Sequence, residues 1–213
     1  MDLEKVRAEL EDDLLWRLEE LAVLRNQATA EGRERHKSVF LKSLVLMLYA
    51  HYEGFCKHAF TVYVRAINAE HLPRSKVSLP IATSSMSQTL DGYFKRNQSF
   101  SAQLGFVTAF DRIWAEVAVL PVDEVVDTES NLKPEVMRKI LCRLGFNEDL
   151  FGDHDGSVQS LMNRRNGVAH GNRTRSISEQ DYRDLEARVL SILDGLITAI
   201  TEAVATGHHL RPA

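Results

Sequence analysis

Apolar side chains recur every three or four positions along most of the chain, which is the spacing of one face of an α-helix. A stripe of this kind runs from Leu3 to Leu24 and predicts a helix that ends before Glu31, with an acidic opposite face. A second helix is predicted for residues 34–70, and residues 39–52 are apolar nearly all round. A helix of that kind belongs at the centre of a bundle.

Shorter helices are predicted in the rest of the chain. Pro73 and Pro80 interrupt the helical period, so residues 71–83 predict a loop or excursion between bundle helices. Ser176 and Glu179 have the spacing of a capping box and predict the start of a long final helix. The other predicted helices cover residues 85–96, 102–119, 134–144 and 157–165, and the final helix extends to residue 204.

The pattern as a whole predicts one all-α domain. No stretch alternates with the two-residue period of a strand, and no repeat or low-complexity linker divides the chain. We therefore expect a single helical domain over residues 1–206, in which residues 71–131 form an insertion or loop-rich region. Residues 207–213 are expected to form a flexible tail.

Composition predicts a protein with a hydrophobic core and without a membrane-spanning segment. The chain has 213 residues, and 44% of them are apolar, which is enough for a hydrophobic core. The purest apolar stretch, residues 44–50, is much shorter than the roughly 20 residues that a membrane-spanning helix needs. The first residues are acidic and lack the basic start of a secretory signal. We expect a cytoplasmic protein with no membrane contact.

No cofactor or metal is expected. Cys56 and Cys142 lie far apart in apolar helical stretches, and we interpret both as reduced core residues without zinc-ligand spacing. Residues 153–156 (DHDG) are interpreted as a helix cap, because Arg164 stands where a calcium loop needs a glutamate. The sequence also has no glycine-rich phosphate loop.

Positive charge is concentrated in one segment. The formal net charge of −4 argues against a general nucleic-acid coat, which normally has a basic surplus. Residues 1–34 contain ten acidic side chains and five Lys or Arg, whereas residues 156–178 contain no acid. The arginines of the second segment are Arg164, Arg165, Arg173 and Arg175.

This acid-free segment contains an arginine and a histidine five positions apart, Arg165 and His170. The spacing alone is not specific, because Arg65 and His71 have a similar one. The context is more specific, since a polar residue follows Arg165 directly and glycines stand at positions 167 and 171.

Three strings of the sequence resemble one known family. RRNGVAHG, at residues 164–171, is similar to the signature of HEPN ribonucleases, which is an arginine, a polar residue, three variable positions and a histidine. LYAHYEGFCK, at residues 48–57, resembles the second helix of the toxin-like branch of that family, the RiboL-PSP-HEPN type. TESNL, at residues 128–132, fits the same branch. The resemblance implies a HEPN-like bundle of long antiparallel helices with extra short helices.

The resemblance also implies a metal-independent endoribonuclease in which the 2′-hydroxyl of RNA attacks the adjacent phosphate. His170 is suited to proton transfer, because the pKa of histidine lies near the working pH. Arg165 is suited to the phosphate, because its planar fork of donors stays charged. Asn166 would donate to a phosphate oxygen or hold His170, and the remaining arginines, Arg164, Arg173 and Arg175, would steer RNA.

Helical geometry limits how these residues can act together. Residues five apart on an unbroken helix point about 140° away from each other. Either the helix breaks at Gly167, or two copies of the segment face each other across a homodimer and complete each other's sites. We favour the dimer, which is usual in HEPN proteins, with Gly167 and Ala169 allowing close approach. The commonplace alternative is that His170 caps a helix and Arg164 and Arg165 meet the dipole of its last turn.

Three polar residues of the most apolar helix have two interpretations. The commonplace one is an ion pair between Glu53 and Lys57 at the helix edge. The functional one is that Glu53 orients His170 or an arginine of the motif, with His51 and Lys57 close by.

The leading functional hypothesis is therefore an RNase toxin of a toxin and antitoxin pair or of an antiphage system, with RNA as substrate and a cognate antitoxin as partner. One alternative is a non-catalytic helical interaction module, which the acidic first helix would suit. Another is that the chain is the regulator of such a pair.

Overall fold

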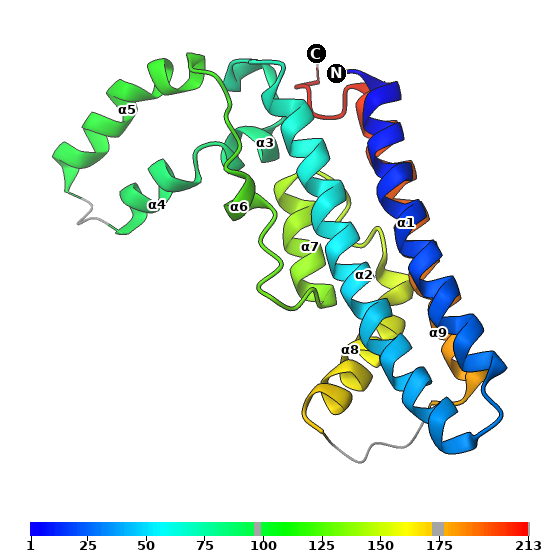
Figure 1. Cartoon of the computed structure of the whole chain (residues 1–213). Helices are drawn as coiled ribbons and strands as arrows, with labels where there is room; N and C mark the ends of the chain where they lie inside the picture. Colours follow the sequence, from blue (N-terminus) through cyan, green and yellow to red (C-terminus); the bar gives the residue numbers. More distant parts are fainter. Residues whose placement is uncertain (96–98, 172–176, 213) are drawn as a thin grey trace.

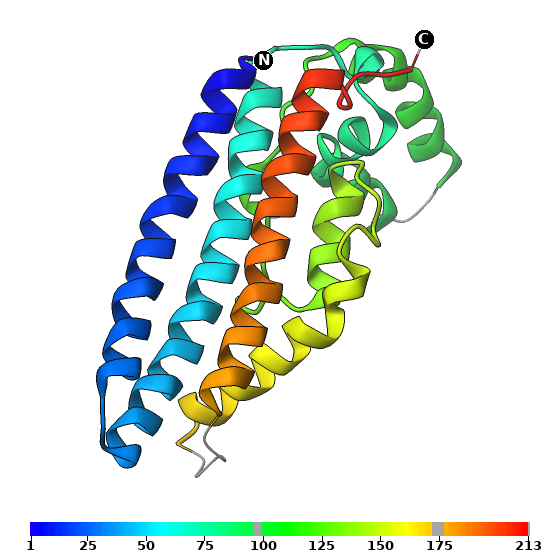
Figure 2. The same ribbon diagram turned by 90° about the vertical axis from the view of Figure 1, so that its right-hand side faces the viewer.

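The computed structural model describes residues 1–95, 99–171 and 177–212, and these residues contain α-helices and short 3-10 turns but no β-strand. The predicted all-α bundle is confirmed. Its longest helices, α1 (Leu3–Ala30), α2 (Glu34–Asn68) and α9 (Glu179–Thr206), pack together, and α2 and α9 start at the same end (Figures 1 and 2). The other helices are α3 (Leu79–Ser84), α4 (Ser87–Lys95), α5 (Phe100–Ala115), α6 (Val122–Val125), α7 (Pro134–Arg143) and α8 (Asp155–Ala169), with the 3-10 turns η1 (Arg74–Lys76) and η2 (Gly152–His154).

Helix α2 is buried on most of its faces, as its apolar composition predicts. Helices α1 and α9 pack against it along its length, and α8 also packs against it. Leu48, Phe55 and Phe60 are fully buried. Each buried side chain of this size contributes roughly 1.5–3 kcal/mol to folding. The bundle therefore depends on α2 having neighbours on several sides.

A buried carboxylate of α9 has hydrogen-bond partners. Glu186 of α9 is buried, and it accepts hydrogen bonds from Arg25 of α1 at 2.7 Å and from the Tyr182 hydroxyl at 3.1 Å. Because a buried carboxylate without partners would cost several kcal/mol, these bonds fix how α1 and α9 face each other.

A second polar cluster joins α1 to α2. Arg17 of α1 bonds the Asp13 carboxylate at 2.8 Å and reaches His51 of α2, where its Nη1 lies 3.4 Å from Nδ1. His51 is buried, with its Nε2 3.3 Å from a Glu20 oxygen. Gly54 leaves the space that Arg17 occupies, because a Cβ there would lie 2.9 Å from the guanidinium.

Residues 71–131 connect α2 to α7 and contain α3 to α6 (Figure 1). The loop predicted for residues 71–83 is shorter than expected, because α3 already starts at Leu79 with Pro80 in its first turn, where proline needs no N–H. α4 and α5 form an arm that projects from the bundle (Figure 1). None of the α5 side chains is buried, and Phe100 and Val107 are 78% and 68% exposed.

The end of the chain is held in place, where the sequence predicted a flexible tail. Gly207 ends α9 in the left-handed conformation that glycine adopts readily. His208 Nε2 then lies 2.8 Å from the Gly145 carbonyl oxygen, and the buried His209 lies 2.8 Å from a Glu70 carboxylate oxygen. These contacts depend on residues far away in sequence, which a reading of the tail alone does not reveal.

Helix α9 and Cys142 also differ from expectation. By length and composition α9 would suffice to cross a membrane, although no purely apolar run indicated this. Buried residues along α9 pack against α1 and α2, and a core helix has the same composition. Its N-cap is Ser178, whose hydroxyl accepts from the Asp181 N–H, whereas Ser176 lies outside the described residues. Cys56 is buried as predicted, but Cys142 is exposed on α7.

The His51 cluster predicts how stability depends on pH. Burial and the neighbouring Arg17 lower the pKa of His51 in the folded protein. The unfolded chain then binds the proton more tightly, with a pKa of about 6.5. Stability should be complete above that pH and should fall as the pH drops through it. We expect the urea midpoint of the wild type to fall between pH 7.5 and 5.5, and that of His51→Gln to fall less.

His36→Gln is the control for this comparison, because His36 lies on the surface beside Glu31. It should show the wild-type pH dependence. An equal loss of stability in all three proteins would contradict the role given to His51.

Candidate active site

Helix α8 carries the motif segment, and it is continuous from Asp155 to Ala169. The sequence predicted a helix that ends near Arg165, which is one turn too early. The helix does not break at Gly167, which is buried. Arg165 and His170 therefore point in directions that differ by more than a right angle, as expected for an unbroken helix.

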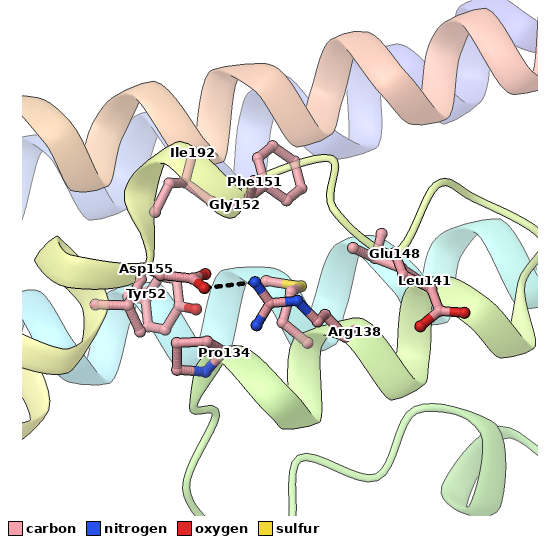
Figure 3. A pocket seen from close by; sticks show the side chains of 11 residues that line it. Tyr52, Pro134, Arg138, Leu141, Glu148, Phe151, Gly152, Asp155 and Ile192 are labelled. Atoms are coloured by element: carbon pink, nitrogen blue, oxygen red, sulfur yellow. Dashed lines mark hydrogen bonds and ion pairs between the residues drawn. The ribbon is translucent and has the colours of Figure 1, made fainter.

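The first turn of α8 is anchored to α7. Asp155 and Asp149 accept hydrogen bonds from Arg138, and the bond to Asp155 is visible in Figure 3. Arg138 and Asp155 line a cavity of about 10 Å³, together with Phe151 and Tyr52. A volume of this size holds about one water molecule. The cavity is thus part of the packing around α8, not a substrate pocket. Residues 153–156 lie where α8 begins, with His154 as the N-cap residue, but no side chain there caps the helix through a hydrogen bond.

Arg165 lies on the ring of Tyr49. Its guanidinium carbon is 4.7 Å from the ring centroid, which is the geometry of a cation–π contact. The Tyr49 hydroxyl donates to the Asn131 side-chain oxygen at 2.6 Å. Arg165 also donates through Nη1 to the Asn166 side-chain oxygen at 2.8 Å. The three strings that carried the family resemblance therefore meet at this point, through Tyr49, Asn131 and Arg165.

Glu53 lies one helical turn after Tyr49, on the same side of α2. Burial and the Glu53 carboxylate raise the pKa of the Tyr49 hydroxyl. Glu53 is thus next to Tyr49, on whose ring Arg165 lies. Lys57 is exposed.

His51 does not belong to this group. It lies two residues from both Tyr49 and Glu53, which turns it to the side of α2 that faces Arg17 on α1. The prediction that His51 stands beside the motif was therefore wrong, because closeness in sequence was mistaken for a shared helix face.

His170 is exposed at the end of α8. It is the C-cap residue, and its backbone N–H donates to the Asn166 carbonyl oxygen at 3.0 Å, after which Gly171 takes a left-handed conformation. Its position agrees with the commonplace interpretation as a cap and leaves the imidazole accessible. Arg164 lies within 3.4 Å of the Ser160 hydroxyl, and neither Arg164 nor Arg165 is in the last turn, so the dipole explanation does not apply to them.

Two of the predicted RNA-steering residues, Arg173 and Arg175, lie outside the described residues. Within residues 1–95, 99–171 and 177–212, no three His, Cys, Asp or Glu side chains gather in a way that could hold a metal ion. Among the described residues at this end of α8, Arg165, Asn166 and His170 supply a guanidinium, an amide and an imidazole.

Sequence reasoning did not assign roles to Tyr49 and Asn131, although both stand in the strings that were compared with the family. A usable signal was present for Tyr49, because Tyr49 and Glu53 are four residues apart and share one face of α2. Asn131 had no local signal, since its partner is 82 residues away.

Comparison with known proteins shows the family to which this chain belongs. The model of one family, described as MAE_28990-like HEPN, matches residues 6–206. Among curated proteins and among solved structures, no significant match was found. The match covers all three strings and the whole bundle.

Substitution by leucine should affect stability differently at Gly167 and at Ala169. Gly167 is buried against its own chain, whereas Ala169 is exposed. Gly167→Leu should lower the free energy of unfolding by about 1–3 kcal/mol, because overpacking outweighs the gain in helix propensity. Ala169→Leu should leave it nearly unchanged in urea titrations at a protein concentration where the chain is monomeric. Equal effects of the two substitutions would contradict the burial of Gly167.

Proposed function

Since the chain belongs to the HEPN domain family, we propose that it is a metal-independent endoribonuclease whose active site is formed by Arg165, Asn166 and His170. HEPN domains are commonly associated with RNase activity. The observation that carries the proposal is the position of Arg165 on Tyr49, next to Asn166 and five residues before an accessible histidine.

The proposed reaction is a transesterification within the RNA backbone. The 2′-hydroxyl loses its proton and attacks the adjacent phosphorus, and the bond to the 5′-oxygen of the next nucleotide breaks. The products are a 2′,3′-cyclic phosphate and a 5′-hydroxyl. His170 exchanges protons with these oxygens, since an imidazole changes charge near neutral pH. Arg165 stabilises the negative charge on the phosphorane.

A homodimer accounts for how two residues on different sides of one helix act together. Of the two arrangements that the sequence allowed, a break at Gly167 is not present, because α8 is continuous to Ala169. The facing arrangement brings Arg165 of one protomer close to His170 of the other. Exposure of Ala169 and His170 supports it, because these residues remain available to a second copy.

In the cell, we propose that the enzyme is the toxin of a toxin and antitoxin pair or part of antiphage defence in the cytoplasm, and that a cognate antitoxin blocks or modifies the site. The alternative is a non-catalytic interaction module or a regulator of such a pair. The projecting α5, with exposed Phe100, Leu104 and Val107, favours this alternative, because apolar patches on one helix are typical of protein-binding surfaces.

Substitution of the motif should separate these two functions. We expect His170→Ala to lower kcat on total RNA by about 10²–10⁴-fold, because general acid–base catalysis is lost. Arg165→Ala should cost at least about 10²-fold, because a charge-stabilising donor is lost. Arg65→Ala and His71→Ala are matched controls, since this pair has similar spacing outside the site, and they should cleave at the wild-type rate. Wild-type protein that cleaves no RNA would support the module.

A mixture of the two inactive variants tests the shared site. In a heterodimer of Arg165→Ala with His170→Ala, one site has both residues and the other has neither. Random exchange makes half of the dimers mixed, so activity should return to about one quarter of the wild-type value. The measurement is RNA cleavage before and after the two proteins are unfolded and refolded together. A mixture that stays inactive would show that both residues act within one protomer.

A further inference from the structure

We infer that Tyr49, held by Asn131, is a positioning residue that sets the plane of the Arg165 guanidinium in the active site. The inference rests on the proposed function, which gives Arg165 its task. It goes further, because it assigns a role to a buried tyrosine of α2 and to the turn around Asn131, neither of which touches the RNA in the proposed reaction.

The ring of Tyr49 supports the Arg165 guanidinium and serves as its platform. Tyr49 is 3% exposed, so its ring cannot move without opening the core. A guanidinium 4.7 Å from the ring centroid loses part of its rotational freedom. The bond from Nη1 to Asn166 adds a second constraint, so that the donor fork of Arg165 has one preferred orientation. Preset orientation matters for catalysis, since a misplacement of about 1 Å can cost about 10²-fold in rate.

Asn131 anchors the Tyr49 ring through a hydrogen bond. The hydroxyl of Tyr49 donates to the Asn131 amide oxygen at 2.6 Å, which fixes the ring at its far end. Burial and the neighbouring Glu53 raise the pKa of this hydroxyl, so it keeps the donated proton over the whole physiological range. The hydrogen bond from Tyr49 to Asn131 therefore persists over that range.

A turn at Glu129 and Ser130 places Asn131 beside Tyr49. Glu129 and Ser130 have φ values of 51° and 56°, so two consecutive residues other than glycine adopt the left-handed conformation. This conformation is unfavourable for such residues and persists only when the surroundings impose it. The Asp127 carboxylate accepts from the Glu129 N–H at 2.8 Å, and the Thr128 carbonyl accepts from the Asn131 N–H at 2.9 Å.

A comparison within α2 shows that burial alone does not require this anchor. Tyr63 is also fully buried, and among the described residues its hydroxyl has no hydrogen-bond partner. The fold thus tolerates a buried tyrosine in this helix without a strained turn. Among the described residues, the two consecutive left-handed residues Glu129 and Ser130 stand beside the tyrosine on whose ring Arg165 lies, which connects this turn to the site.

The test compares Tyr49→Phe, Tyr49→Leu and Asn131→Ala with Tyr63→Phe as the matched control. Tyr49→Leu removes the platform and should lower kcat by about 10–100-fold with little change in KM. Tyr49→Phe and Asn131→Ala remove only the anchor and should lower kcat several-fold. Tyr63→Phe should cleave at the wild-type rate. In an Arg165→Lys background, Tyr49→Leu should cause no further loss, because its effect passes through Arg165.

A second measurement does not depend on RNA cleavage. In protein labelled with ¹⁵N-arginine, the Arg165 Nε–H resonance should be shifted upfield by the Tyr49 ring, identified by its loss in Arg165→Lys, and should respond to inorganic phosphate. Tyr49→Leu should remove the upfield shift.

The outcomes separate the inference from the proposed function. Wild-type rates in the Tyr49 and Asn131 variants, or losses that merely follow the folded fraction, would overturn the positioning role while the RNase stands. A wild-type chain that cleaves no RNA but has the shifted, phosphate-responsive resonance would overturn the RNase and keep the positioning role. An Arg165 resonance without the ring shift would overturn the inference directly.

Discussion

Helix α2 must bury side chains on nearly all of its faces, and the positions of α1, α8 and α9 follow from that requirement. The three neighbours cover different sides of it, so each contact of α2 has its own chemistry. On the side of α1, His51 meets Arg17, whereas on the side of α8, Tyr49 meets Arg165. A single helix thus separates a structural polar cluster from the candidate site, because two residues along a helix are enough to change sides.

The sequence predicted the helices whose apolar period is regular and missed features that depend on distant contacts. The bounds of α1 and α2 lie within two residues of the prediction, because apolar spacing and the break at Gly32 are local signals. α8 continues past its last regular apolar position to Ala169, and Gly167 near its end is buried, which a polar string such as RRN does not indicate. The ordered position of the last residues was not predictable for the same reason, since His209 contacts Glu70, which is far away in sequence.

In the candidate site, too, the sequence predicted what local order determines and missed what contacts between distant residues determine. The residues of RRNGVAHG were identified from their order alone, and the unbroken helix explains why one chain does not bring Arg165 and His170 to the same side. The support of the site was not predictable, because Tyr49 and Asn131 become neighbours only after α2 and the turn at Glu129 are in place. The family match over residues 6–206 includes α8 as well as Tyr49 and Asn131.

The chemistry of cleavage is the central claim, and product analysis tests it most directly. Purified protein is incubated in EDTA with an RNA oligonucleotide that it cuts, and with the same oligonucleotide carrying one 2′-deoxynucleotide 5′ of the cut. Metal-independent attack by the 2′-hydroxyl predicts cleavage in EDTA, a 2′,3′-cyclic phosphate and a 5′-hydroxyl at the ends, and no cut at the deoxy position. Cleavage at the deoxy position, 5′-phosphate ends or a requirement for Mg²⁺ would contradict the account.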